Sequence, residues 1–258
     1  MNLDNLKTLA CELENGSLII QLNRGKANPI NMTMITELRQ TIRFAAENEA
    51  IRGVILVGKP HFFSAGVDII AAFQMNEAEI KAFWQNFIEM VIDLSSFSKP
   101  MISAITGHAP AGGCVLAICC DYRVMASGKY SIGLNEIPVG IIVPETIFHL
   151  YSFWLGERLA YQYLLEGKLL KSEQALAVGL VDELAEGSEV LAVAKKQMAK
   201  YLQFDANTWQ MSKTNLRKNL MAKLDVDFEP LFAPVLEQWW RPTTRKRLEM
   251  VIASLKKS

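Results

Sequence analysis

The sequence predicts an α/β fold with a helical C-terminal region. Short apolar segments with strand character alternate with amphipathic helical patterns as far as residue 143, and the pattern after Pro144 is almost wholly helical. Such alternation is typical of sheets that are covered by helices. A chain of 258 residues, of which 50% are hydrophobic, can bury a core of ordinary size. No low-complexity linker divides it, so we expect one folding unit.

The first hundred residues alternate strands and helices. Residues 53–58 (GVILVG) and 100–105 (PMISAI) are apolar along almost their whole length, as expected for central strands that are covered on both faces. Between them, apolar residues recur at three- and four-residue spacing, which indicates amphipathic helices. The expected strands are residues 17–23, 53–58 and 100–105, and the expected helices begin at Thr33 and at Glu77.

The second half continues with shorter elements. After residues 107–113 we expect a short apolar helix that ends at Cys120, and then two short strands, residues 121–126 and 129–132. The rest is predicted to be helical, with a break at residues 239–242. We therefore divide the folding unit into an α/β core, residues 1–195, and a helical C-terminal region, residues 196–258.

The composition excludes several classes of function. Lys and Arg number 27 and Asp and Glu number 27, so no overall positive field attracts nucleic acid or an anionic membrane surface. No apolar run approaches the roughly 18 residues of a membrane span. The first fifteen residues contain no apolar segment of the signal-peptide type. We expect a cytoplasmic protein with no nucleic-acid or membrane partner.

The cysteines and histidines do not form a metal-binding pattern. Cys11 stands alone, whereas Cys114, Cys119 and Cys120 lie within one apolar stretch. Zinc sites usually show paired cysteines or histidines at short spacing, and no such pairing with a second pair is present. We interpret the cysteines as free thiols of a reducing compartment, and we predict no metal site.

Two glycine-containing turns follow the buried strands. They are residues 61–68 (HFFSAGVD) and 107–114 (GHAPAGGC). Each places backbone N–H groups at the carboxyl end of a strand, where ligands of α/β proteins tend to bind. Two N–H groups aimed at one point form an oxyanion hole, to which a helix that begins near Gly112 adds its positive end. The alternative is that both are only tight turns between strand and helix.

A single carboxylate lies in an apolar run, residues 132–141 (IGLNEIPVGI). Glu136 loses hydration in such surroundings, which raises the pKa of its carboxyl group and suits it to carry protons near neutral pH. The local sequence is equally consistent with an exposed loop glutamate or with a partner of Arg123.

Together these segments resemble the crotonase (enoyl-CoA hydratase/isomerase) superfamily. The resemblance rests on FSAGVDI, ITGHAPAGGCVLAICCDYR and IGLNEIPVGI in this order, with NRGKANPIN before them and ALAVGLVDEL after them. It implies a spiral of β-β-α units that form two sheets, with C-terminal helices that build homotrimers or hexamers. It implies an acyl-CoA substrate and no separate cofactor, because coenzyme A enters as part of the substrate.

The resemblance also assigns roles to residues. It places the oxyanion hole at the backbone N–H groups of Ala65 and Gly112, and the acid–base group at Glu136. It places the other substrate contacts at Lys26, Ala27, Ser64, Asp68, Ile69, Pro110, Val115 and Asn135. An enolate of a thioester requires two such donors at the oxygen where negative charge develops.

The residue at position 115 separates the possible reactions. Hydratases of the family carry a second glutamate at the position that corresponds to Val115, and a hydrocarbon there cannot activate water. A single glutamate suits the transfer of a double bond from C3 to C2, so the chain resembles the Δ3,Δ2-enoyl-CoA isomerases of fatty acid β-oxidation. The alternatives are an unusual hydratase, a decarboxylase, or an acyl-CoA-binding relative without turnover.

Overall fold

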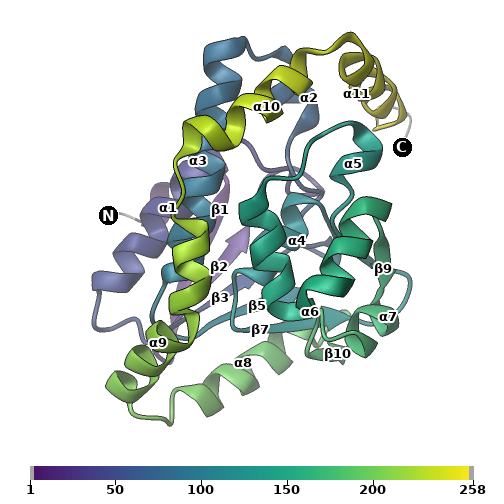
Figure 1. Cartoon of the computed structure of the whole chain (residues 1–258). Helices are drawn as coiled ribbons and strands as arrows, with labels where there is room; N and C mark the ends of the chain where they lie inside the picture. The colour runs from purple at the N-terminus through teal and green to yellow at the C-terminus, as the bar shows by residue number, and fades with distance from the viewer. Residues whose placement is uncertain (1–2, 256–258) are drawn as a thin grey trace.

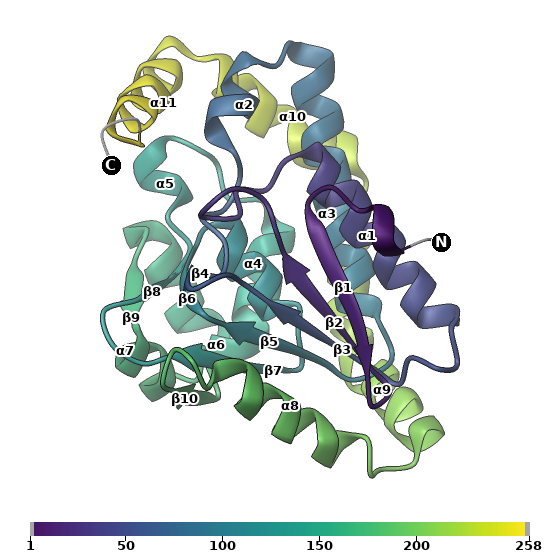
Figure 2. The same ribbon diagram turned by 180° about the vertical axis from the view of Figure 1, so that it is seen from behind.

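Two β-sheets form the centre of the computed structural model, which describes residues 3–255 (Figures 1 and 2). The larger sheet has the strand order β1-β2-β3-β5-β7-β10, and the smaller one has the order β4-β6-β8-β9. The larger sheet contains β1 (Leu9–Glu14), β2 (Ser17–Leu22), β3 (Gly53–Val57), β5 (Met101–Ile105), β7 (Tyr122–Ala126) and β10 (Glu183–Ala185). The smaller sheet contains β4 (His61–Phe62), β6 (Gly107–Pro110), β8 (Ser131–Gly133) and β9 (Leu169–Lys171). Apart from the antiparallel pairs β1–β2 and β8–β9, neighbouring strands are parallel.

A β-β-α unit occurs three times in succession. Strands β3, β5 and β7 belong to the larger sheet, and the strand that follows each of them, β4, β6 or β8, belongs to the smaller sheet. The helices that complete the units are α2 (Ile69–Gln74) with α3 (Glu77–Ser96), then α4 (Gly112–Ile118), then α5 (Glu136–Val139) with α6 (Glu145–Glu166). This arrangement confirms the α/β class and the repeated β-β-α units.

Helices cover both faces of the larger sheet. One face packs on the main core, which includes α1 (Met32–Glu47), α3 and α4. The other face packs on α8 (Val190–Tyr201), whose Val190, Ala194 and Met198 contact the outward-facing residues of the central strands. Because β3 and β5 are buried on both faces, every residue in them is buried, which accounts for their continuous apolar sequences.

Several short strands were not expected from the sequence. Strand β1 pairs with β2 through a turn at Asn15 and Gly16, both with positive φ. Strands β4, β9 and β10 have only two or three residues each, too few for a period-2 pattern to be visible. The region after Pro144 therefore includes two strands and is not wholly helical. The expected boundary at residue 195 falls inside α8, which is one continuous helix packed on the sheet.

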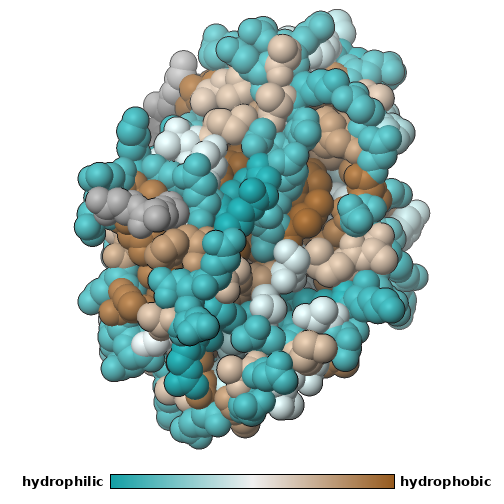
Figure 3. Space-filling model, turned by 90° about the vertical axis from the view of Figure 1, so that its left-hand side faces the viewer, coloured by the Kyte–Doolittle hydropathy of each residue, from teal (hydrophilic) through white to brown (hydrophobic). Residues whose placement is uncertain are grey.

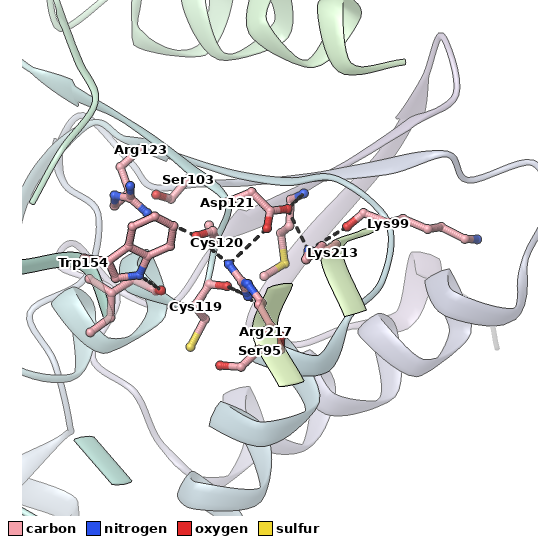
Figure 4. A network of polar contacts seen from close by, with 12 residues as sticks. Ser95, Lys99, Ser103, Cys119, Cys120, Asp121, Arg123, Trp154, Lys213 and Arg217 are labelled. Carbon is pink, nitrogen blue, oxygen red and sulfur yellow. Dashed lines mark hydrogen bonds and ion pairs between the residues drawn. The ribbon is translucent and has the colours of Figure 1, made fainter. Parts of the chain in front are cut away.

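A buried network of charges fixes the first of the C-terminal helices, α9 (Ala206–Leu224), to the core (Figure 4). Arg217 donates hydrogen bonds to the carbonyl groups of Ser95, Cys119 and Cys120, which lie at the ends of α3 and α4. Lys213 pairs with Asp121 at 2.7 Å. Cations at a helix C-terminus satisfy its free carbonyl groups. The network thus fixes the C-terminal end of α4, whereas the glycine turn lies at the N-terminal end of the same helix.

The remaining helices are α7 (Ser172–Ala177), α10 (Phe228–Trp240), α11 (Pro242–Leu255) and the 3-10 turn Leu3–Asn5. Helices α10 and α11 pass over α2 and α3 at one end of the molecule (Figure 1). The face seen in Figure 3 is a mixture of hydrophilic and apolar side chains, with the apolar ones in separate patches. Within residues 3–255, no helix is long and apolar enough to cross a membrane.

Candidate active site

A cavity of about 890 Å³ lies where the two glycine turns meet the helices. Its walls come from the loop before α1, the turn before α2, the N-terminus of α4, α5 and the segment that follows α5. Helices α3, α10 and α11 also contribute to the lining. The lining is mostly apolar and includes few polar side chains, as in many sites for small ligands.

Glu136 is the first residue of α5 and lines this cavity. Its carboxylate oxygen Oε2 is buried and has no hydrogen-bond partner in the described part of the chain. Arg123, an alternative partner considered from the sequence, pairs instead with Asp182 at 2.5 Å. Glu136 is therefore neither an exposed loop residue nor half of an ion pair.

Burial raises the pKa of the Glu136 carboxyl group from 4.5 to about 7, and a hydrogen bond from its own backbone N–H opposes this rise. A carboxyl group with this pKa is charged in about half of the molecules at neutral pH, and it can both accept and return a proton there. These are the properties required of a general base that also acts as an acid.

We expect this pKa to reduce the stability of the folded protein at high pH. The folded protein holds the Glu136 proton up to about pH 7, whereas the unfolded chain releases it near pH 4.5. Stability is therefore lost as the pH rises through this window. Glu136→Gln removes the titration, so it should raise the free energy of unfolding at pH 8 by at most about 3 kcal/mol. Urea denaturation at pH 8 and pH 4 measures this, and an equal difference at both values would contradict it.

Two backbone N–H groups of the glycine turns lie close together without acceptors. Ile30 and Val67 form a parallel β-bridge, in which the N–H of Ile30 donates to the carbonyl oxygen of Gly66 and the N–H of Asp68 donates to the carbonyl oxygen of Ile30. The N–H of Val67, which lies between these two bonded residues, therefore points away from Ile30. Neither this group nor the N–H of Gly112, the first residue of α4, has a hydrogen-bond partner among residues 3–255. A Cβ on Gly112 would lie 3.3 Å from the Val67 nitrogen. Both residues line the cavity, so the pair can bind one negatively charged oxygen.

The assignment of Ala65 as an oxyanion donor is wrong in this structure. Its N–H donates to the carbonyl group of Ala27 at 2.8 Å and is not free for a ligand. Val67, two residues further along, provides the unbonded donor instead. No sequence motif marks this difference, because it depends on how the turn pairs with Ile30.

The two turns approach each other because glycine allows it. A Cβ on Gly113 would lie 2.4 Å from the carbonyl oxygen of Ser64, closer than any side chain can be accommodated. Gly66 has a φ of +86°, which favours glycine. Substitution of either glycine would therefore separate Val67 from Gly112.

An ion pair lies at the edge of the cavity. Arg24 and Asp68 pair at 2.6 Å, and Asp68 also accepts from the backbone N–H of Ala71 at the start of α2. Lys26, the expected substrate contact, is exposed and does not line the cavity. Arg24, two residues earlier in the same turn, lines the cavity instead.

The other predicted site residues are brought together with two exceptions. Those that line the cavity are Ala27, Ala65, Asp68, Ile69, Pro110, Gly112, Val115, Asn135 and Glu136. Lys26 does not, and neither does Ser64, which is buried and donates to the carbonyl oxygen of Asn28. Four further residues reach the cavity from α10 and α11 and have no distinguishing feature in the sequence: Phe232, Val235, Val251 and Leu255.

The histidines and cysteines of the described chain have the following surroundings. His108 lines the cavity, and its Nδ1 lies 3.0 Å from Ser131 Oγ. Burial lowers the pKa of His108, with the nearby Lys171 and His61 adding to this effect. In the part of the chain that the structure describes, no group of three or more His, Cys, Asp or Glu residues is arranged to hold a metal ion. The described cysteines are all free thiols.

Comparison with known proteins places this geometry in a family. The model of the enoyl-CoA hydratase/isomerase family matches residues 12–229. The chain belongs to this family. It is 34% identical to mitochondrial enoyl-CoA delta isomerase 1 of Mus musculus over 247 residues, which cover 93% of this chain and 84% of the relative. It is 28% identical to a short-chain-enoyl-CoA hydratase of Clostridium acetobutylicum over 85% of each chain.

The family resemblance extends to the whole fold. The crystal structure of human mitochondrial delta3-delta2-enoyl-CoA isomerase superposes with a TM-score of 0.93 at 28% sequence identity. The superposition covers 97% of this chain and 99% of the human one. The similarity therefore includes the C-terminal helices that line the cavity, and it confirms the crotonase fold expected from the sequence.

Proposed function

We propose that this family member is a Δ3,Δ2-enoyl-CoA isomerase, which moves a double bond from C3 to C2 of an acyl-CoA thioester. The observation that carries the proposal is a single carboxyl group, that of Glu136 with a pKa of about 7, in an apolar cavity that also holds two free backbone N–H groups. The similarity to proteins named enoyl-CoA delta isomerase supports it.

The proposed reaction uses one base and one oxyanion hole. The thioester carbonyl oxygen binds between the N–H groups of Val67 and Gly112, which acidifies the C2 protons. Glu136 removes a C2 proton, and the negative charge of the resulting dienolate rests on the thioester oxygen. Protonated Glu136 then returns the proton to C4. One carboxyl group is sufficient because C2 and C4 lie on one face of the planar dienolate.

The wall beside Glu136 favours isomerisation over hydration. Val115 lines the cavity and is buried, and its neighbours in α4 are also buried and apolar. Among the side chains of residues 3–255 that line the cavity, the only other carboxylate is Asp68, which is paired with Arg24. Addition of water needs a second group to orient and deprotonate it, and Val115 cannot do so. Hydration is the second candidate reaction, because one relative is named as a short-chain-enoyl-CoA hydratase.

The cavity fits an extended apolar acyl chain. Trp84 and Phe87 of α3, together with residues of α10 and α11, add large apolar side chains to its lining. We propose that the acyl chain lies here and that the thioester lies between the two turns. Arg24 at the edge of the cavity is then placed toward the coenzyme A part of the substrate. Assembly of the chain into trimers or hexamers, and action without a further cofactor, belong to the same proposal.

The direct test is an assay of the purified protein with a 3-enoyl-CoA. We expect the absorbance of the conjugated 2-enoyl thioester to appear in proportion to the enzyme added. No conversion of 3-enoyl substrates of any chain length tested, from six to twelve carbons, would contradict the proposed function.

A further inference from the structure

The carbonyl groups at the C-terminal end of helix α4 are bound by side chains from α6 and α9 (Figure 4). Trp154 of α6 donates its indole N–H to the carbonyl oxygen of Ile118 at 2.7 Å. Arg217 of α9 donates to the carbonyl oxygens of Cys119 at 3.0 Å and Cys120 at 3.3 Å. The last carbonyl groups of a helix have no partner within the helix, so these two side chains supply bonds that the helix backbone cannot.

The opposite end of α4 carries an oxyanion donor. Helix α4 has seven residues, Gly112–Ile118, and all of them are buried. A helix of this size is about 10 Å long, and its internal hydrogen bonds make it move as one body. A displacement of its C-terminal end therefore also changes where the N–H of Gly112 points.

The turn that precedes α4 does not hold the helix in a relaxed conformation. Ala111 has a φ of +48°, in the region that favours glycine, and its methyl side chain cannot cap the helix. The N–H of Ala111 donates to the carbonyl oxygen of Gly133 at 2.8 Å. A strained backbone persists only where the surrounding structure fixes it. The bonds at the C-terminal end of α4 are such a constraint, because they limit how far the helix can shift to relieve the strain.

We propose that Trp154 and Arg217 are positioning residues for the oxyanion hole, which act through α4 and aim the N–H of Gly112 at the thioester oxygen. This inference rests on the proposed function. Neither side chain lines the cavity, so neither touches the substrate. An oxyanion donor is effective only when it is fixed before the negative charge develops. A displacement of about 1 Å at a catalytic site can lower the rate by about 10²-fold, so residues remote from the substrate can control it.

Both donors are themselves held in place by charged groups. The guanidinium of Arg217 pairs with Asp121 at 3.0 Å. The guanidinium of Arg123 lies 3.7 Å from the centre of the Trp154 ring, and it also donates to the carbonyl oxygen of Cys120 at 3.2 Å. Loss of one donor therefore leaves other bonds to the end of α4, and we expect single variants to fold.

The first variant, Trp154→Phe, removes one hydrogen bond to α4 and keeps an aromatic ring. Its matched control is Trp209→Phe: Trp209 of α9 is also half-buried, and its indole N–H has no hydrogen-bond partner among residues 3–255. The second variant, Arg217→Lys, keeps a positive charge beside Asp121, but one ammonium group cannot reproduce the fork of the guanidinium.

We expect kcat with a 3-enoyl-CoA to fall about tenfold in Trp154→Phe and in Arg217→Lys, because the oxyanion donor is displaced. It should stay within about twofold of the wild type in Trp209→Phe. The Kd of hexanoyl-CoA, a saturated ligand, should change less than about twofold in all three, because the misplaced donor matters most when charge develops on the oxygen.

A readout without turnover separates this inference from the proposed function. Hydrogen bonds to a carbonyl oxygen lower its stretching frequency, so the infrared band of bound hexanoyl-CoA, ¹³C-labelled at the thioester carbon, reports on the oxyanion hole directly. We expect this band to shift toward the frequency of the free thioester in Trp154→Phe and Arg217→Lys, and to keep the wild-type frequency in Trp209→Phe.

A role limited to stability would lower the midpoint of thermal unfolding but leave kcat and the band at their wild-type values, and this result would overturn the inference. Equal changes in Trp209→Phe and Trp154→Phe would overturn it as well. An inactive wild type would refute the proposed isomerase, while the band would still decide whether α4 positions the donor. Failure of hexanoyl-CoA to bind the wild type would overturn both.

Discussion

Glu136→Gln is expected to lower turnover of a 3-enoyl-CoA by at least about 10²-fold, the lower range for the loss of a positioned acid–base group. The amide has nearly the same shape as the carboxyl group, but it cannot accept the C2 proton. Because Glu136 Oε2 has no hydrogen-bond partner among residues 3–255 and Arg123 pairs with Asp182 instead, replacement of Glu136 should leave the fold and the affinity for a saturated acyl-CoA nearly unchanged. Steady-state kinetics and calorimetric titration measure the two effects separately.

Glu145→Gln provides the matched control. Glu145 is exposed at the start of α6, nine residues after Glu136, and it does not line the cavity. Its substitution should leave turnover within about twofold of the wild type, as for an ordinary surface change. Activity that survives in Glu136→Gln would show that another group moves the proton, and the mechanism proposed above would be abandoned.

Removal of the Val67 N–H is expected to lower kcat by about 10²–10³-fold, the usual cost of losing one oxyanion donor. Val67→Pro removes this hydrogen, whereas Val67→Ala keeps it and changes only the side chain. The preceding residue is Gly66, whose backbone freedom reduces the restriction that proline places on its neighbour. The Val67 N–H makes no hydrogen bond within residues 3–255, so no internal bond is lost.

The comparison of the two Val67 variants tests the corrected oxyanion hole. Circular dichroism first establishes that each variant is folded, and kcat is then measured with the same 3-enoyl-CoA. We expect Val67→Ala to stay within about tenfold of the wild type. If folded Val67→Pro retains the activity of Val67→Ala, the Val67 N–H does not hold the thioester oxygen.

The central elements of the fold were predictable because their burial requires a regular pattern of apolar residues in the sequence. Strands β3 and β5 are apolar throughout because helices cover both faces, and α3 shows a regular apolar face. Strand β10 shows no such pattern, because it has only three residues, Glu183–Ala185. It extends the sheet through parallel pairing with β7, and this pairing is specified by the tertiary structure alone. Packing of this kind also holds α8, in which residue 195 lies, against the sheet.

The site could be predicted only where side-chain type decides the chemistry. Glu136 could be singled out because a carboxylate among apolar residues is unusual, but only the family resemblance assigned it the acid–base role, and the same resemblance drew attention to Val115. The donor at Val67 was not recognisable, because any residue has an N–H and only hydrogen-bond pairing determines whether it is free. Residues of α10 and α11 that line the cavity have the same periodicity as core residues and differ from them only in position.

The most direct test of the central claim, that one carboxyl group isomerises without adding water, is a ratio of two rates on the same protein. The purified wild type is incubated separately with a 3-enoyl-CoA and with the 2-enoyl-CoA of the same chain length, and products are separated by mass. We expect rapid conversion of the 3-enoyl thioester to the conjugated isomer, and hydration of the 2-enoyl thioester at less than about one hundredth of that rate, since a single missing acid–base group costs about 10²-fold or more. Hydration at a rate comparable with isomerisation would mean that a second group activates water, and the assignment of a single base to this site would be wrong.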